Sequence, residues 1–258
     1  TVFFTDIKDF TTISERMEPE ALVDQLGEYF EAMSSALRQQ PPATLDKFIG
    51  DSIMAFWGAP LPNPDHAVTA CRAALACQER LKELHDKWIR EGKPLFYQRI
   101  GINTGEVIVG NMGSATRLNY TVVGDTVNTA SRFEGLNKLY GTWIIIGQST
   151  WELAKGQFVA RPLDLVSVKG SMKGVRIYEL MAEAAGAGES TRAVAGLAAE
   201  AMEHYLSRRW SEAIACYDRI LEIQPGDQPS RIMKDRCRDM LASQPPEDWN
   251  GVHRIESK

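Results

Sequence analysis

The sequence is poor in the residues from which most zinc and redox centres are built. Its 258 residues include four cysteines, and no two of them form a C-x-x-C pair. The four histidines also lack the H-x-x-x-H spacing of a zinc-binding helix. We therefore expect reduced cysteines, as in a cytosolic compartment, and histidines with structural or surface roles. These residues are Cys71, Cys77, Cys216, Cys237, His66, His85, His204 and His253.

Long apolar runs and an excess of positive charge are missing too. No apolar stretch approaches the roughly 20 residues that a membrane span needs, and no signal peptide is visible. The 29 basic and 34 acidic residues give a net charge of −5. Such a chain has no general electrostatic attraction for nucleic acid or an anionic membrane. We expect a cytoplasmic domain without a nucleic-acid partner, in which individually placed residues must hold any bound phosphate.

The length indicates one main domain with a small appendage. We expect the main domain over residues 1–183, a small, glycine-containing linker over residues 184–190 and a helical extension over residues 191–258. Within the extension, residues 201–225 resemble one tetratricopeptide repeat, a unit that cannot bury a core alone. The extension should therefore pack on the main domain or on a partner.

The chain starts inside an apolar stretch, Thr1-Val2-Phe3-Phe4, and without a methionine. This start is typical of a fragment. We expect the parent protein to hold a sensor or a membrane anchor upstream of it.

The pattern of apolar residues predicts an α+β fold. Strands are expected over residues 1–5, 44–49, 52–57 and 97–103, with helices over residues 22–37 and 64–91 between them. A tight Gly50-Asp51 turn joins the second strand to the third. The resulting order, β-α-β-β-α-β, predicts a ferredoxin-like sheet with helices on one face. Further helices and strands are expected over residues 106–181.

This topology brings two aspartates together. The third strand lies antiparallel beside the first, so Asp6 at the end of the first strand comes next to Asp51 at the start of the third. Two carboxylates in such a place can hold a pair of divalent cations, one at the attacking oxygen and one at the leaving group. Taken singly, each aspartate also has an ordinary structural explanation, as a turn residue or a helix cap.

The loop after Asp6 supplies a second element. Its residues 8–12, which include Phe10 and Thr11, run into a helix whose first amides lack partners within the helix. A helix start of this kind binds phosphate through its backbone N–H groups and its dipole. Every helix has one, so the signal is unspecific by itself.

Four stretches together resemble the class III adenylate and guanylate cyclases in order and in spacing. They are residues 4–11 (FTDIKDFT), 47–55 (KFIGDSIMA), 99–105 (RIGINTG) and 120–132 (YTVVGDTVNTASR). Any one of them is a weak signal, whereas four linked motifs are specific. The resemblance covers about residues 1–182.

The resemblance implies an adenylate cyclase, a phosphorus-oxygen lyase that converts ATP to 3′,5′-cyclic AMP and pyrophosphate. Its active site would lie at the interface of a head-to-tail homodimer. One chain would contribute the metal-binding residues, and the other the residues that read the base and stabilise the transition state. Two divalent cations, Mg²⁺ or Mn²⁺, are expected on Asp6, Asp51 and the Ile7 carbonyl.

Further residues match positions of the family that act on the ribose and the phosphates. From the partner chain, Asn128 and Arg132 match residues that orient the ribose and stabilise charge on the α-phosphate. Arg99 and the partner chain's Lys169 match residues that bind the terminal phosphates. Outside this motif context, the Asn128 and Arg132 pair would read as an ordinary helix surface and Lys169 as a turn lysine.

Substrate choice depends on Lys47 and Thr121, which match the partner-chain pair that reads the purine. A lysine can donate to adenine N1, and a threonine can accept from the 6-amino group. The family's guanylate enzymes carry glutamate at the position of Lys47, which favours ATP here. Many adenylate members carry aspartate at the position of Thr121. Threonine marks a subgroup that includes bicarbonate-responsive enzymes, and bicarbonate sensitivity stays open.

Two other readings compete with an active enzyme. A cyclase-like domain can serve as a nucleotide sensor without turnover, but such proteins usually lose a metal aspartate or the Asn/Arg pair. This chain keeps Asp6, Asp51, Asn128 and Arg132. The helical extension could also make the chain a scaffold, although one lone repeat offers little surface for that role.

Overall fold

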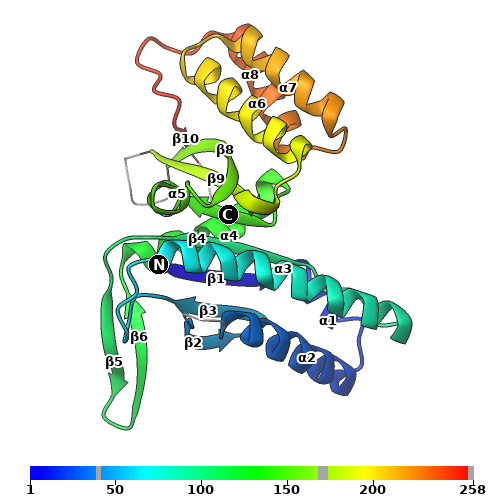
Figure 1. The fold of residues 1–258 in the computed structure, drawn as a ribbon, viewed down its shortest axis with the longest axis vertical. Helices are drawn as coiled ribbons and strands as arrows, with labels where there is room; N and C mark the ends of the chain where they lie inside the picture. The colour runs from blue at the N-terminus through cyan, green and yellow to red at the C-terminus, as the bar shows by residue number, and fades with distance from the viewer. Residues whose placement is uncertain (39–41, 168–173, 255–258) are drawn as a thin grey trace. The chain divides into compact units, whose positions relative to one another are not determined.

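The computed structural model describes residues 1–38, 42–167 and 174–254 (Figure 1). The chain divides into two compact units, Thr1–Gly135 and Leu136–Lys258.

The first unit is built on an antiparallel sheet with the strand order β4-β1-β3-β2. Its strands and helices follow one another in the predicted order, which confirms the ferredoxin-like core. They are β1 (Val2–Ile7), α1 (Phe10–Ser14), α2 (Pro19–Leu37), β2 (Thr44–Ile49), β3 (Ser52–Phe56), α3 (His66–Glu91) and β4 (Gln98–Asn103). A separate two-stranded ribbon, β5 (Ile108–Ser114) and β6 (Arg117–Val123), then leads into α4 (Asp125–Tyr140), whose last turn belongs to the second unit.

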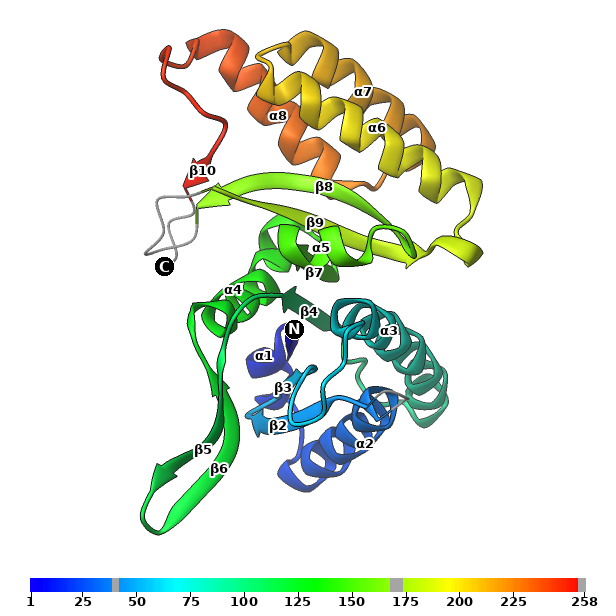
Figure 2. The ribbon, with the colours of Figure 1, turned by 60° about the vertical axis from the view of Figure 1, so that its left-hand side comes forward.

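Both faces of this sheet are covered. Helices α2 and α3 lie side by side on one face (Figures 1 and 2), where the Thr5 hydroxyl meets Tyr29 Oη at 3.4 Å. Residues of β1 alternate between the faces, so Phe4 and Asp6 point the other way. On that opposite face Ala130 of α4 joins an apolar cluster with Val2 and with strand residues Met54, Phe56 and Val122. The predicted βαββαβ core is present, but the expectation of helices on one face only was incomplete, because α4, which lies outside that order, covers the other face.

A glycine lets α4 approach β4 this closely. A Cβ atom on Gly101 would lie 2.1 Å from the backbone nitrogen of Glu134 and 2.3 Å from the carbonyl oxygen of Ala130. Any side chain here would push the helix off the strand. The close approach fixes the height of α4 above the end of the sheet that holds Asp6.

The second unit combines a small sheet with the C-terminal helices. Its elements are β7 (Ile144–Gly147), α5 (Gln148–Ala154), β8 (Phe158–Ser167), β9 (Val175–Glu183), a 3₁₀ turn (Ala184–Gly186), α6 (Glu189–Leu206), α7 (Trp210–Ile223), α8 (Gln228–Ser243) and β10 (His253–Arg254). The strands lie in the order β7-β9-β8-β10. Helix α6 packs on β8 (Figure 2), and α7 contacts both α6 and α8.

The helical extension is thus part of a folded unit, as expected for a single repeat-like segment that needs a partner surface. The segment predicted as a linker, residues 184–190, forms the 3₁₀ turn and the first residues of α6. The proposed domain boundaries and the tetratricopeptide character stay predictions. No helix within the described residues is long and apolar enough to cross a membrane.

Buried ion pairs join α8 to β8. The carboxylate of Asp164 on β8 is fully buried, accepts a hydrogen bond from Tyr140 Oη at 2.5 Å and pairs with Arg236 Nη1 of α8 at 2.5 Å. Arg161, also on β8, pairs with Glu179 at 2.6 Å and with Asp227, the residue before α8, at 2.8 Å. The Asp164–Arg236 and Arg161–Asp227 pairs therefore depend on the docking of α8.

Arg236→Leu tests this docking. The substitution leaves the buried Asp164 carboxylate without its ion-pair partner, which should lower the free energy of unfolding by about 3 kcal/mol in urea denaturation. Arg238→Leu is the matched control, because Arg238 pairs with Asp235 at 3.0 Å where both side chains are exposed. The control should change stability by less than about 0.5 kcal/mol. Equal stabilities of the two variants would contradict a structural role for the buried pair.

Candidate active site

The two predicted carboxyl groups lie together at one end of the first sheet. Asp51 sits in the turn between β2 and β3, where Gly50 adopts a left-handed φ of +62°. The backbone N–H of Ile7 donates to Asp51 Oδ2 at 2.9 Å, and the Ser52 hydroxyl donates to Asp6 Oδ1 at 3.1 Å. Antiparallel pairing of β1 with β3 therefore holds both acids in place.

This crowding raises the pKa of Asp6 to about 6. Partial burial is the largest cause, and the hydrogen bond with Asp51 and its charge act in the same direction. The Ser52 hydroxyl and the charge of Arg99 oppose them. Arg99 lies directly opposite Asp6 in the β1–β4 pairing and is 9% exposed, so a buried guanidinium stands beside the acids.

A third acid, Glu134 on α4, was not predicted from the sequence. Burial and, to a smaller extent, the charges of Asp6 and Asp51 raise its pKa to about 8, against the opposing charge of Arg99. One signal was available in the sequence. Glu134 lies four residues after the buried Ala130, so it occupies a sheet-facing helix position where an apolar residue is usual.

The donor set at this end of the sheet fits a hard divalent cation. Three carboxyl groups face one guanidinium, and carboxylate oxygens are the ligands that Mg²⁺ and Mn²⁺ prefer. A cation at Asp6 and Asp51 would offset the repulsion that raises the pKa of Asp6. The backbone carbonyl of Ile7, at the end of β1, belongs to the same region.

A second group of predicted residues lies at the ribbon and the edge strand. Lys47 Nζ on β2 donates to Thr121 Oγ1 on β6 at 3.2 Å. The Thr121 hydroxyl donates to Asp46 Oδ2 at 2.5 Å, and Lys47 Nζ lies 3.3 Å from Asp46 Oδ1. The predicted base-reading pair is thus in contact within one chain, and Asp46 is an addition that the sequence did not suggest.

The remaining predicted residues lie on or near helix starts. Asn128 is exposed and Arg132 is half-buried, one turn apart on α4. Phe10 and Thr11 open α1, a helix of only five residues that follows Asp9 in a left-handed conformation. Helix α1 does not continue into the helix predicted over residues 22–37. Pro19 starts α2, because proline favours the first helical turn and an extended residue before it. Lys169 lies outside the described residues.

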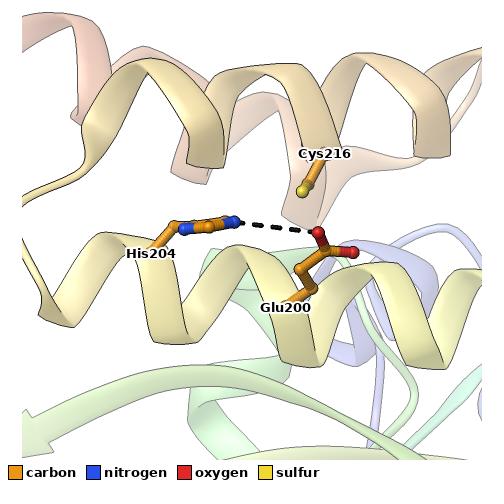
Figure 3. Close-up of side chains that lie close together, drawn as sticks. All are labelled: Glu200, His204 and Cys216. Atoms are coloured by element: carbon orange, nitrogen blue, oxygen red, sulfur yellow. Dashed lines mark ion pairs between the residues drawn. The ribbon is translucent and has the colours of Figure 1, made fainter.

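Another cluster in the second unit has ligand types that suit a metal, although the histidine spacing gave no hint of it. Glu200 and His204 lie one turn apart on α6, and Cys216 faces them from α7, with candidate ligand atoms within 4.8 Å of one another (Figure 3). His204 Nε2 lies 3.7 Å from Glu200 Oε1. A metal-bound histidine normally donates its other ring N–H, whereas His204 Nδ1 is buried and finds no hydrogen-bond partner among the described residues. The cluster reads as a helix ion pair beside a thiol whose pKa burial raises.

Asp6→Asn tests the electrostatic cost of the acid pair in metal-free protein. The raised pKa means that the fold favours protonated Asp6, so stability is lost as pH rises through about 6. Asparagine carries no charge and can still accept from Ser52 and donate to Asp51. We expect thermal unfolding in EDTA to show a gain of about 2–5 °C at pH 8 and almost none near pH 4. Asp24→Asn, an exposed control on α2, should show no such trend, and a less stable Asp6→Asn chain at pH 8 would contradict the argument.

Comparison with known proteins identifies the family of this chain. The family model described as adenylate and guanylate cyclase catalytic domain matches residues 1–182. The chain is 44% identical over 181 residues to adenylate cyclase 1 of Rhizobium meliloti (strain 1021), an alignment that covers 70% of the chain and 27% of that protein. The chain therefore spans about a quarter of the length of this curated relative.

Solved structures give the same result. The adenylyl cyclase CyaB from P. aeruginosa is 37% identical with a TM-score of 0.66, over 72% of this chain and 95% of that one. The guanylyl cyclase Cya2 is 35% identical with a TM-score of 0.63, over 73% of this chain and 92% of that one. The chain belongs to the adenylate and guanylate cyclase catalytic domain family.

Proposed function

We propose that this chain is the catalytic domain of an adenylate cyclase, converting ATP to 3′,5′-cyclic AMP and pyrophosphate in a head-to-tail homodimer. One observation carries the proposal: a single unit holds both the acid pair and the Lys47–Thr121 pair, with Lys47 and Asp6 on the same face of one sheet. Lys47 lies opposite Met54 and Met54 opposite Phe4, and Phe4 shares its face with Asp6. Two copies facing each other would form two equivalent sites.

The reaction needs positioning and charge neutralisation more than covalent catalysis. The ribose 3′-oxygen attacks the α-phosphorus in line, a new P–O bond forms, and the bond to the pyrophosphate leaving group breaks. Class III cyclases use divalent metal ions. Two of them, Mg²⁺ or Mn²⁺, when bound at Asp6, Asp51 and the Ile7 carbonyl, would lower the pKa of the attacking hydroxyl and neutralise phosphate charge.

The protein residues have separate tasks around that centre. Asn128 and Arg132 from the partner chain would orient the ribose and stabilise the charge that develops on the α-phosphate. An exposed amide and a half-buried guanidinium one turn apart on α4 suit this task. Arg99, buried beside the acids, would hold the terminal phosphates, together with Lys169 and the backbone at Phe10 and Thr11.

Lys47 and Thr121 support ATP as the substrate. An ammonium group can donate to adenine N1, and the threonine oxygen can accept from the 6-amino group. Guanine presents a donor at N1 and an acceptor at O6, so both contacts would be mispaired. The 3.2 Å contact between Lys47 and Thr121 holds the two groups side by side before any nucleotide arrives.

The direct test incubates the purified chain with ATP or GTP plus Mg²⁺ or Mn²⁺ and quantifies the cyclic product. We expect cyclic AMP from ATP, and a loss of at least about a hundredfold in turnover for Asp6→Ala and for Asn128→Ala. Asp24→Asn, far from the site on an exposed part of α2, should keep full turnover. Nucleotide binding without any cyclic product would show a sensor domain instead.

Mixing inactive variants tests the shared site. In a mixed dimer of Asp6→Ala and Asn128→Ala chains, one site carries both defects and the other carries neither. Random pairing makes half of the dimers mixed, so the mixture should recover about a quarter of normal turnover. Asp6→Ala mixed with Asp51→Ala should recover nothing, because both defects fall in the metal-binding half. Equal recovery in the two mixtures, or none in either, would argue against a two-chain site.

A further inference from the structure

We infer that Asp46 is a positioning residue that fixes the direction of the Thr121 hydroxyl and thereby makes the base site select adenine over guanine. The inference rests on the proposed function, since it assigns a task to a residue that supports the Lys47–Thr121 pair. Asp46 itself is not expected to touch the nucleotide.

An irregularity in β2 brings Asp46 to this place. Neighbouring residues in a regular strand point to opposite faces, so Asp46 and Lys47 would normally diverge. The pairing of β2 with β3 shifts register between Leu45 and Lys47, which leaves Asp46 at a bulge. Bulges re-aim side chains, and here two successive residues both reach Thr121.

The contacts of Asp46 point to a task at Thr121. Its side chain is fully buried, with Oδ2 accepting from the Thr121 hydroxyl at 2.5 Å. Oδ1 lies 3.3 Å from Lys47 Nζ, as an ion pair without the alignment of a hydrogen bond. An ionised carboxylate has no proton to give, so the hydroxyl proton between Asp46 and Thr121 must come from Thr121.

The protons and lone pairs of Lys47 and Thr121 determine which hydrogen bonds these two residues can make with a base. Threonine has one O–H and two acceptor sites. The O–H is committed to Asp46, and one acceptor site takes an N–H of Lys47. A single acceptor site on Thr121 is left, beside the remaining N–H groups of Lys47.

One donor beside one acceptor is the complement of the adenine edge, with its N1 acceptor and its 6-amino donor. Guanine would be mispaired at both positions. Its N1–H donor would face the ammonium donor of Lys47, and its O6 acceptor would face a Thr121 oxygen whose proton is already donated to Asp46. A freely rotating hydroxyl would not discriminate, because it could donate to O6 as readily as it accepts from an amino group. The carboxylate of Asp46 removes that freedom.

Asp46→Asn tests the inference with almost no change in shape. The asparagine amide can donate to Thr121, which frees the hydroxyl to turn its proton toward the base. We expect kcat/KM to fall for ATP and to rise for GTP, so that their ratio falls by about ten- to a hundredfold. Purine riboside triphosphate, which lacks the 6-amino group, should be used as well by the variant as by the unmodified chain. Near-UV circular dichroism and thermal unfolding establish that the variant is folded.

A double-mutant cycle separates positioning from a structural role. In a Thr121→Val background there is no hydroxyl to direct, so Asp46→Asn should no longer change the ATP/GTP ratio. Asp24→Asn, the exposed control, should leave the ratio unchanged in either background. The same fall in the ratio with and without the Thr121 hydroxyl would overturn the inference. A chain that makes no cyclic nucleotide before any substitution would instead refute the proposed function, so the two failures are distinguishable.

Discussion

The antiparallel pairing of β1 with β3 is the constraint on which the site depends. It forces Asp6 and Asp51 together at the end of a sheet, against their mutual repulsion and with partial loss of solvent. Glu134, brought down by the close approach of α4 to Gly101, adds a third acid. A fold selected for stability alone would avoid such a cluster, because each raised pKa marks a charge that the fold disfavours. The hydrophobic layers on both faces of the sheet supply the stability that offsets this cost.

The sequence was sufficient for those parts of the fold that depend on local pattern. Apolar periodicity gave the βαββαβ order, and the glycine at position 50 marked the turn that carries Asp51. The sequence pattern could not show the features that depend on contacts between distant segments. Glu134 is an ordinary helical acid until Gly101 draws α4 onto the sheet. Asp46 is an ordinary strand acid until a bulge turns it inward. Pattern reading assumes regular strands and solvated charges, and the site departs from both assumptions.

The C-terminal helices contain a second feature that could not be predicted from the sequence pattern. Sequence patterns alone would place charged residues of these stretches in solvent. In the second unit, however, three of them are almost fully buried and form ion pairs, namely Asp164, Arg161 and Arg236. Removing two charges from water repays its cost only when geometry and further hydrogen bonds satisfy both partners. Here Tyr140 Oη donates to the Asp164 carboxylate beside its ion pair with Arg236. Strand β8 and its charged side chains thus provide the packing surface for the single repeat-like segment. In an array of repeats, the neighbouring repeats would supply that surface.

If Lys47 and Thr121 read the base as proposed, the Asp46–Thr121 contact explains how a threonine can do the work of an acidic acceptor in this chain. An ionised aspartate accepts in every orientation, so it reads an amino group without help. A threonine hydroxyl can either donate or accept a hydrogen bond. It acts toward the base only as an acceptor when its proton is already donated to another group. In the proposed base site, Asp46 and Thr121 together would act as one acceptor whose negative charge is set back from the base. An aspartate at position 121 would place a second carboxylate beside the buried carboxylate of Asp46. The Thr121 hydroxyl oxygen now lies 2.5 Å from Asp46 Oδ2. Under the inference above, an acidic residue before Lys47 therefore favours threonine over aspartate at position 121, because two carboxyl groups at this distance would raise each other's pKa.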